Sequence, residues 1–130
     1  MKFTLNFQPR QIVCLEHLGT CLYAEVIQVI GARQLCWVRP LLLSVQASSQ
    51  ESEATLPLND LRLLADLIWP VKLFRPALDT EVIPLLTQLL VSEPQPEHDP
   101  VAQQRFDQFI HQVWQAHQAR FNTKETSEAP

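Results

Sequence analysis

The sequence predicts an α+β protein, with a small antiparallel β-barrel over residues 1–76 and two α-helices packed on it within residues 77–121. Two observations predict this division. Short runs of alternating or continuous apolar residues, bounded by turn-forming residues, occupy the first part and are typical of β-strands. The second part carries apolar residues at spacings of three and four, which is typical of amphipathic helices. Residues 122–130 are polar and are expected to form a disordered tail.

The strands of the first part can be placed in order. Residues 2–7 alternate between polar and apolar, and residues 11–17 form a second short run, so each predicts a strand. Residues 21–45 follow, and they predict two paired strands around a turn at 31–33. A third strand is expected after Pro40, where the missing backbone N–H predicts a bend or an edge position.

The strand that starts near residue 21 is apolar on both faces. Leu22, Ala24 and Val26 share one face, and Tyr23 and Ile27 share the other. This pattern suits a strand that is covered on both sides, or one that bends across a barrel.

Residues 58–69 allow two structures. A helix over 59–69 would place Leu61, Leu64 and Ile68 on one side, with Asn59 as its N-cap. A helical turn over 59–62 followed by a strand over 65–69 also fits, and we favour it, because a helical turn before the last strand is common in small barrels.

Two helices complete the chain. The first is expected over residues 79–90, with Pro84 either inside it or at its regular start. A Pro-rich linker over 92–100 precedes the second, for which Asp99 is the predicted N-cap and Pro100 the first helical residue. The apolar stripe of the second helix consists of Phe106, Phe109, Ile110, Val113, Trp114, His117 and Phe121.

Charge and composition narrow the classes of function. The net charge is −4, with a net of +2 in residues 1–46 and six basic against twelve acidic residues, a net of −6, in residues 47–130. Nucleic-acid binders usually carry a basic face, so the overall charge does not favour such a partner. No apolar run reaches the ~18 residues that a membrane-spanning helix needs. The three cysteines lack metal-site spacing, and we expect a cytoplasmic protein with reduced thiols.

No catalytic or metal site is predicted, and no cofactor. Cys14, Cys21 and Cys36 stand singly on different strands and are interpreted as small core residues. His111 and His117 are six residues apart on one helix and cannot jointly hold a metal ion. With only two glycines the chain cannot form a Gly-rich phosphate loop. We therefore expect that the protein is not an enzyme.

An aromatic residue shortly before a proline recurs three times, at residues 37–40, 67–70 and 73–76, and in the first and last of these an arginine stands between the two. Arg and Trp are favoured anchors of protein interfaces, and such surfaces on small barrels dock peptides. The predicted partner-binding residues are Trp37, Arg39, Trp69, Phe74, Arg75 and Trp114. The alternative is structural: Trp37, Trp69 and Phe74 fill the core, and Arg39 and Arg75 pair with Asp66, Asp79 or Glu81.

The run QPRQIVCLE, then LYAEVIQV, then QLCWVRPL resembles the strand order of SH3-like small β-barrels. The phrases LYAEVIQVI, RQLCWVRPL and LFRPALDTEVIPLL are similar to a conserved cyanobacterial protein of unassigned function, over residues 8–90. This resemblance implies a fold and a photosynthetic host, and it brings no catalytic residues with it.

Three functions are compatible with these patterns. The first is a protein-interaction module: an adaptor, an assembly factor or a small subunit of a larger complex. Its partner is another protein, and a second copy of this chain, docked through the helix at 100–121, is a further candidate. The second is a nucleic-acid-binding barrel that uses Lys2, Arg10, Arg33 and Arg39. The third is a redox regulator that acts through a cysteine.

Overall fold

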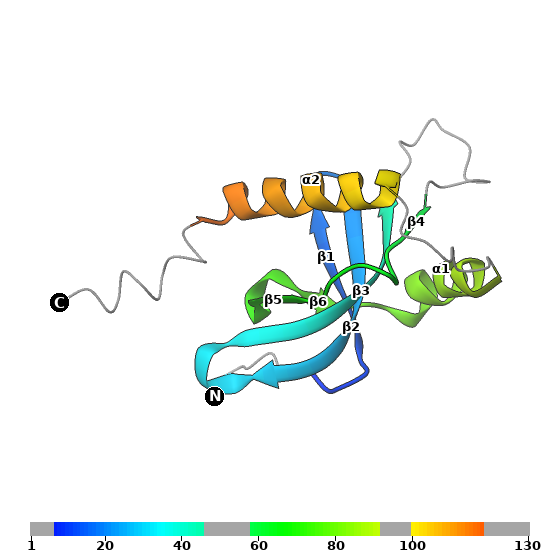
Figure 1. Ribbon diagram of the computed structural model, residues 1–130. Helices are drawn as coiled ribbons and strands as arrows, with labels where there is room; N and C mark the ends of the chain where they lie inside the picture. Colours follow the sequence, from blue (N-terminus) through cyan, green and yellow to red (C-terminus); the bar gives the residue numbers. More distant parts are fainter. Residues whose placement is uncertain (1–6, 46–57, 92–99, 119–130) are drawn as a thin grey trace.

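The computed structural model of the chain describes residues 7–45, 58–91 and 100–118. The expected strand over 2–7, except for Phe7, the linker over 92–99, the N-cap Asp99, Phe121 and the tail over 122–130 lie outside these residues. Within them an antiparallel sheet is followed by two helices, which confirms the α+β class (Figure 1). The sheet does not close, and its form is compatible with a barrel-like or an open sheet.

Three strands form the centre of the sheet. β1 (Ile12–His17) pairs with β2 (Thr20–Ile30), and β2 pairs along its whole length with β3 (Leu35–Val45). The β1–β2 connection is a tight turn in which Leu18 and Gly19 both have positive φ angles, of 50° and 81°. A short 3₁₀ helix, η1 (Gly31–Arg33), joins β2 to β3 at the predicted turn.

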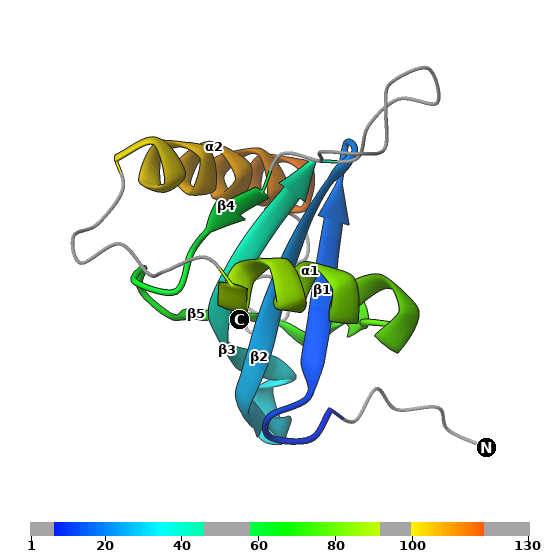
Figure 2. The same ribbon diagram turned by 90° about the vertical axis from the view of Figure 1, so that its right-hand side faces the viewer.

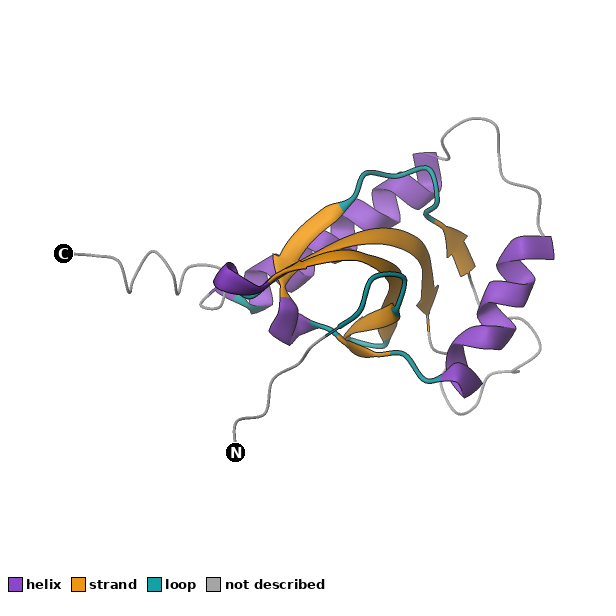
Figure 3. Cartoon of the chain, turned by 90° about the horizontal axis from the view of Figure 1, so that it is seen from below, coloured by secondary structure: helices purple, strands orange, loops and turns teal. Residues whose placement is uncertain are grey.

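β3 runs through Pro40 without a break, which corrects the expected interruption. The pairing with β2 instead shifts register there, because Tyr23 faces Leu42 and Ala24 faces Pro40. A second register shift lies between Val26 and Gln28 of β2, which face Val38 and Trp37 of β3. Such bulges leave one residue unpaired and bend a strand, so a proline can be accommodated at this point. The curvature of the long strands is visible in Figure 3.

The ambiguous segment folds as strands. β4 (Leu58–Asp60) and β5 (Leu67–Pro70) both pair with β3, at its end and its beginning respectively. The favoured strand near 65–69 is thus confirmed. The expected helical turn at 59–62 is wrong in position: the 3₁₀ helix η2 (Val71–Leu73) follows β5 and leads to β6 (Arg75–Pro76), which pairs with β1.

The larger core lies between the bent sheet and α2 (Pro100–Ala116). α2 crosses the ends of β1 and β3 (Figures 1 and 2). Its stripe inserts Phe106, Phe109 and Val113 among strand residues such as Leu22 and Val38. The second helix therefore packs on the sheet of its own chain, as one of the two sequence interpretations predicts.

A second, smaller core covers the other face of the same strands. Cys14, Cys21 and Tyr23 point to this side and pack against Val82 and Leu89 of α1 (Asp79–Val91). Neighbouring residues of β1 and β2 thus alternate between two cores, which confirms that these strands are covered on both sides. α1 begins at Asp79 and contains Pro84 within it.

Candidate functional site

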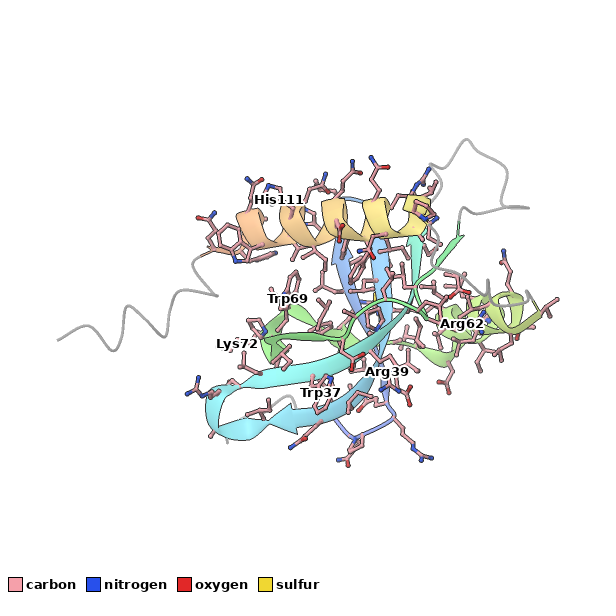
Figure 4. All side chains as sticks on the ribbon, viewed as in Figure 1. Trp37, Arg39, Arg62, Trp69, Lys72 and His111 are labelled. Carbon is pink, nitrogen blue, oxygen red and sulfur yellow. The ribbon has the colours of Figure 1, made fainter. Side chains whose placement is uncertain are left out.

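The first half of β3 presents Trp37 and Arg39 on the outer side of the sheet, away from α2 (Figure 4). Both side chains contact one carboxylate: Trp37 Nε1 donates a hydrogen bond of 2.9 Å to Asp66 Oδ2, and Arg39 Nε lies 3.5 Å from Asp66 Oδ1. Ile68, on the neighbouring strand, faces Trp37 and is exposed. The predicted partner-binding pair is thus accessible and is already ordered by Asp66.

Two of the predicted partner-binding residues belong to the core. Trp69 is 9% exposed and Phe74 is 3% exposed, and both pack in the larger core. Figure 4 shows Trp69 between β5 and α2. Their rings fill the space under α2, because β5 and η2 turn them inward. The interpretation of these two residues as surface anchors is therefore wrong, and the structural alternative is confirmed for them.

Arg75 lies at the centre of an ionic network on the α1 side. Its Nη2 is 3.1 Å from Glu81 Oε1 and 3.3 Å from Glu16 Oε1, and its Nη1 donates to Glu81 Oε2 at 3.1 Å. Tyr23 adds a hydrogen bond of 2.8 Å from its hydroxyl to Glu81 Oε1. The network connects β1, β2, β6 and α1, while the Arg75 side chain stays 41% exposed, so a partner-binding role for Arg75 stays a prediction.

The Arg75 network predicts a pH dependence of stability. Burial acts to raise the pKa of Glu81, but the hydrogen bonds from Arg75 and Tyr23 outweigh it, so the pKa lies below its ordinary value of 4.5. Glu81 therefore contributes stability above about pH 4.5, and this contribution is lost as the pH falls through the lowered pKa. In acid titrations followed by circular dichroism, Glu81→Gln should lose less stability than the wild type between neutral pH and about pH 3. Glu25→Gln, outside the network, should follow the wild type, and equal losses in all three proteins would contradict the role of Glu81.

Trp114 stands apart from the stripe in which the sequence places it. It is 41% exposed, whereas Val113 beside it is fully buried. A dimer through α2 cannot use Phe106 and Phe109, because the chain's own sheet already covers them. Val101 and Trp114 are the large apolar side chains that α2 leaves exposed.

The cysteines are buried, as expected, but two of them meet. Cys14 and Cys21 lie diagonally across the β1–β2 hairpin, and their sulfur groups share a hydrogen bond. This bond raises the pKa of Cys14 and lowers that of Cys21, while burial raises the pKa of Cys36 to about 11. Solvent reaches neither sulfur of the pair, since the two residues are at most 1% exposed. Regulation through these thiols stays a prediction.

A second apolar face of α1 was not predicted from the sequence. Val82 and Leu89 point into the smaller core, but Ile83, Leu90 and Val91 are exposed, by 56%, 72% and 78%. With Thr87 these residues occupy positions i, i+4, i+7 and i+8, so they form one continuous stripe along the outside of the helix. We call residues 83, 87, 90 and 91 the outer stripe. Its signal in the sequence is that this helix is apolar nearly all round.

The described parts of the chain hold no group of three or more Cys, His, Asp or Glu residues that could bind a metal ion. The rings of His17 and His117 are 6.3 Å apart between centroids, and they belong to no such group of three or more in these ranges. No helix in the same ranges is long and apolar enough to cross a membrane.

Comparison with known proteins gives no match, whether with protein-family models, with curated proteins or with solved structures. The function must therefore be inferred from the geometry of the chain itself.

Proposed function

We propose that the chain is a non-enzymatic protein-interaction module, acting as an adaptor, an assembly factor or a small subunit of a larger complex. The observation that carries this proposal is the outer stripe of α1. A helix that is apolar all round is normally buried on all sides, yet α1 buries only one of its apolar faces within its own chain.

The spacing of the outer stripe matches a known mode of recognition. Helices that dock into an apolar groove of another protein present anchors at positions i, i+3 or i+4, and i+7. The inner face and the Arg75–Glu81 ion pair fix α1 on the sheet, so the stripe is presented in one orientation. A helix that is already folded and oriented loses little conformational entropy on binding.

Trp37, Arg39 and Ile68 offer a second contact area on β3 and β5. The arginine is accessible, and its neighbour Trp37 supplies the kind of ring that is enriched at interfaces. The nucleic-acid alternative is weaker, because Arg39 is paired with Asp66 and the net charge of the chain is −4.

Affinity capture from the source cell tests the proposal. Leu90→Asp places a charge in the centre of the stripe without disturbing the core, since Leu90 is largely exposed. The wild-type chain should recover a stoichiometric protein partner, and Leu90→Asp should reduce its recovery at least about tenfold, because a charge that is buried without a partner is costly.

Leu18→Asp is the matched control for this capture. It makes the same change at a leucine that is 84% exposed in the β1–β2 turn, where aspartate tolerates the positive φ angle. Recovery with this variant should equal that of the wild type. If both variants lose the partner equally, or if neither does, the outer stripe is not the docking surface.

A further inference from the structure

A groove of about 460 Å³ opens between α2 and the ends of β2, β3 and β4. Its volume falls within the ~300–1,000 Å³ that is typical of ligand sites. Leu43 and Phe109 contribute apolar surface to it, and Val101 lies at one end. The groove is separate from the outer stripe, because every helical residue that lines it belongs to α2.

The helical wall of the groove is a row of amides. Gln104, Gln108 and Gln112 follow one another at intervals of one helical turn, about 6 Å along the axis. None of the three side chains hydrogen-bonds to another residue in the parts of the chain that the structure describes. By contrast, Gln103 outside the groove bonds to Asp107 at 2.9 Å. Both the donors and the acceptors of the row are therefore available to a ligand.

The opposite wall contains an unsatisfied acceptor. Asn59 Oδ1, on the edge strand β4, is shielded from solvent and has no hydrogen-bond partner within the described ranges. Buried polar atoms of native proteins are nearly always hydrogen-bonded, so an orphaned acceptor indicates a missing donor. Asn59 also lines the groove, so a rotation of its side chain would bring this oxygen to the N–H group of a bound ligand.

The charge of the groove further restricts the class of ligand that it can bind. Among the lining residues that the structure describes, Arg105 is the one charged side chain, and no carboxylate in the same ranges pairs with it. A single guanidinium fits one carboxylate, whereas nucleic-acid backbones are bound by several basic residues. The ligand is therefore expected to carry one acidic group.

We propose that this groove binds a short extended peptide segment of another protein that carries one acidic side chain. Alternate residues of an extended chain repeat every ~6.6–6.8 Å, close to the ~6 Å spacing of the glutamines, so successive glutamine amides can bond to alternate peptide groups of the ligand. Asn59 accepts a backbone N–H, Arg105 binds the carboxylate, and an apolar side chain contacts Val45 and Val101, which line the groove and are not buried in the core.

Selection from a displayed library of random seven-residue peptides on the full-length chain tests this site. Enriched peptides should share one Asp or Glu at a fixed position beside an apolar residue.

An enriched peptide, labelled with fluorescein, should bind Arg105→Glu at least tenfold more weakly and Gln108→Ala several-fold more weakly. Gln115→Ala, on the same helix outside the groove, should bind like the wild type. The absence of an acidic motif, or full binding by Arg105→Glu, would overturn the proposal.

Asn59→Leu separates a ligand contact from a structural role. Because it removes an unsatisfied acceptor, this variant should keep or raise the melting temperature while it binds the peptide at least tenfold more weakly. A lower melting temperature with unchanged peptide binding would mean that Asn59 only supports the fold.

The site is also independent of the proposed docking of α1: Leu90→Asp should retain peptide binding, and Arg105→Glu should retain capture of the partner protein.

Discussion

Replacing Phe106 with alanine is expected to lower the free energy of unfolding by about 3–5 kcal/mol. Phe106 is 4% exposed and joins α2 to the larger core, so its loss leaves a cavity between the helix and the sheet. Chemical denaturation followed by far-UV circular dichroism measures the change. Gln115→Ala, at an exposed position of α2, should shift the free energy by less than about 0.5 kcal/mol.

The Phe106 result decides whether α2 is part of the folded domain. If Phe106→Ala had no more effect than Gln115→Ala, the helix would not be packed on the sheet in solution. Its apolar face would then be open to a partner or to a second copy of the chain, as the other sequence interpretation holds.

Trp69→Ala is expected to lower the free energy of unfolding by a similar amount, about 3–5 kcal/mol. Its ring lies in the larger core beneath α2, and its backbone pairs with Cys36 of β3. Trp37→Ala provides the comparison within the same pair of strands. Trp37 is half-buried, and its replacement by alanine removes one accessible hydrogen bond to Asp66. We therefore expect the free energy of unfolding to fall by about 1 kcal/mol or less.

The two tryptophan variants should also differ in fluorescence. Trp69 is nearly shielded from solvent, so its removal should delete the more blue-shifted part of the emission, whereas removal of Trp37 should not. Equal losses of stability for Trp69→Ala and Trp37→Ala would contradict the placement of Trp69 in the core.

Much of the fold could be predicted from periodicity. The apolar spacing of α2, with its N-terminal proline, specifies both its type and the face that it buries. The two apolar faces of β2 predict cover on both sides, and the structure supplies it with two cores. The segment at 58–69 could not be decided, because Leu61, Leu64 and Ile68 fit a helix as well as separate strands, and only pairing with β3 selects the latter.

The candidate sites depend on contacts between distant residues, and local patterns do not specify these. Trp37 and Trp69 stand in similar aromatic–Pro phrases, yet β3 turns one outward and β5 turns the other inward. Cys14 and Cys21 look isolated until the hairpin register brings them together. The match of Arg39 with Asp66 and of Arg75 with Glu81 was predictable as one of several pairings, and the sheet and α1 select among them.

The outer stripe was missed for a different reason. Helical periodicity identifies one buried face, and the spacing of i, i+3, i+4, i+7 and i+8 from Val82 places Leu90 on it. In the structure α1 is oriented so that Val82 and Leu89 face the smaller core and Leu90 faces outward. The remaining signal is that this helix has more apolar residues than its own core can cover, and the proposed function assigns the uncovered ones to a partner protein.

Site-specific photo-crosslinking tests the docking role of α1 most directly. A photoreactive phenylalanine analogue replaces Ile83 in the outer stripe, and in a parallel protein it replaces Leu18 at the distant β1–β2 turn. Irradiation in the source cell should give one dominant crosslink to a different protein from position 83 and none of that product from position 18. Leu90→Asp in the same chain should abolish it. Identical products from both positions, or crosslinks from position 83 to the chain itself alone, would contradict the proposed function.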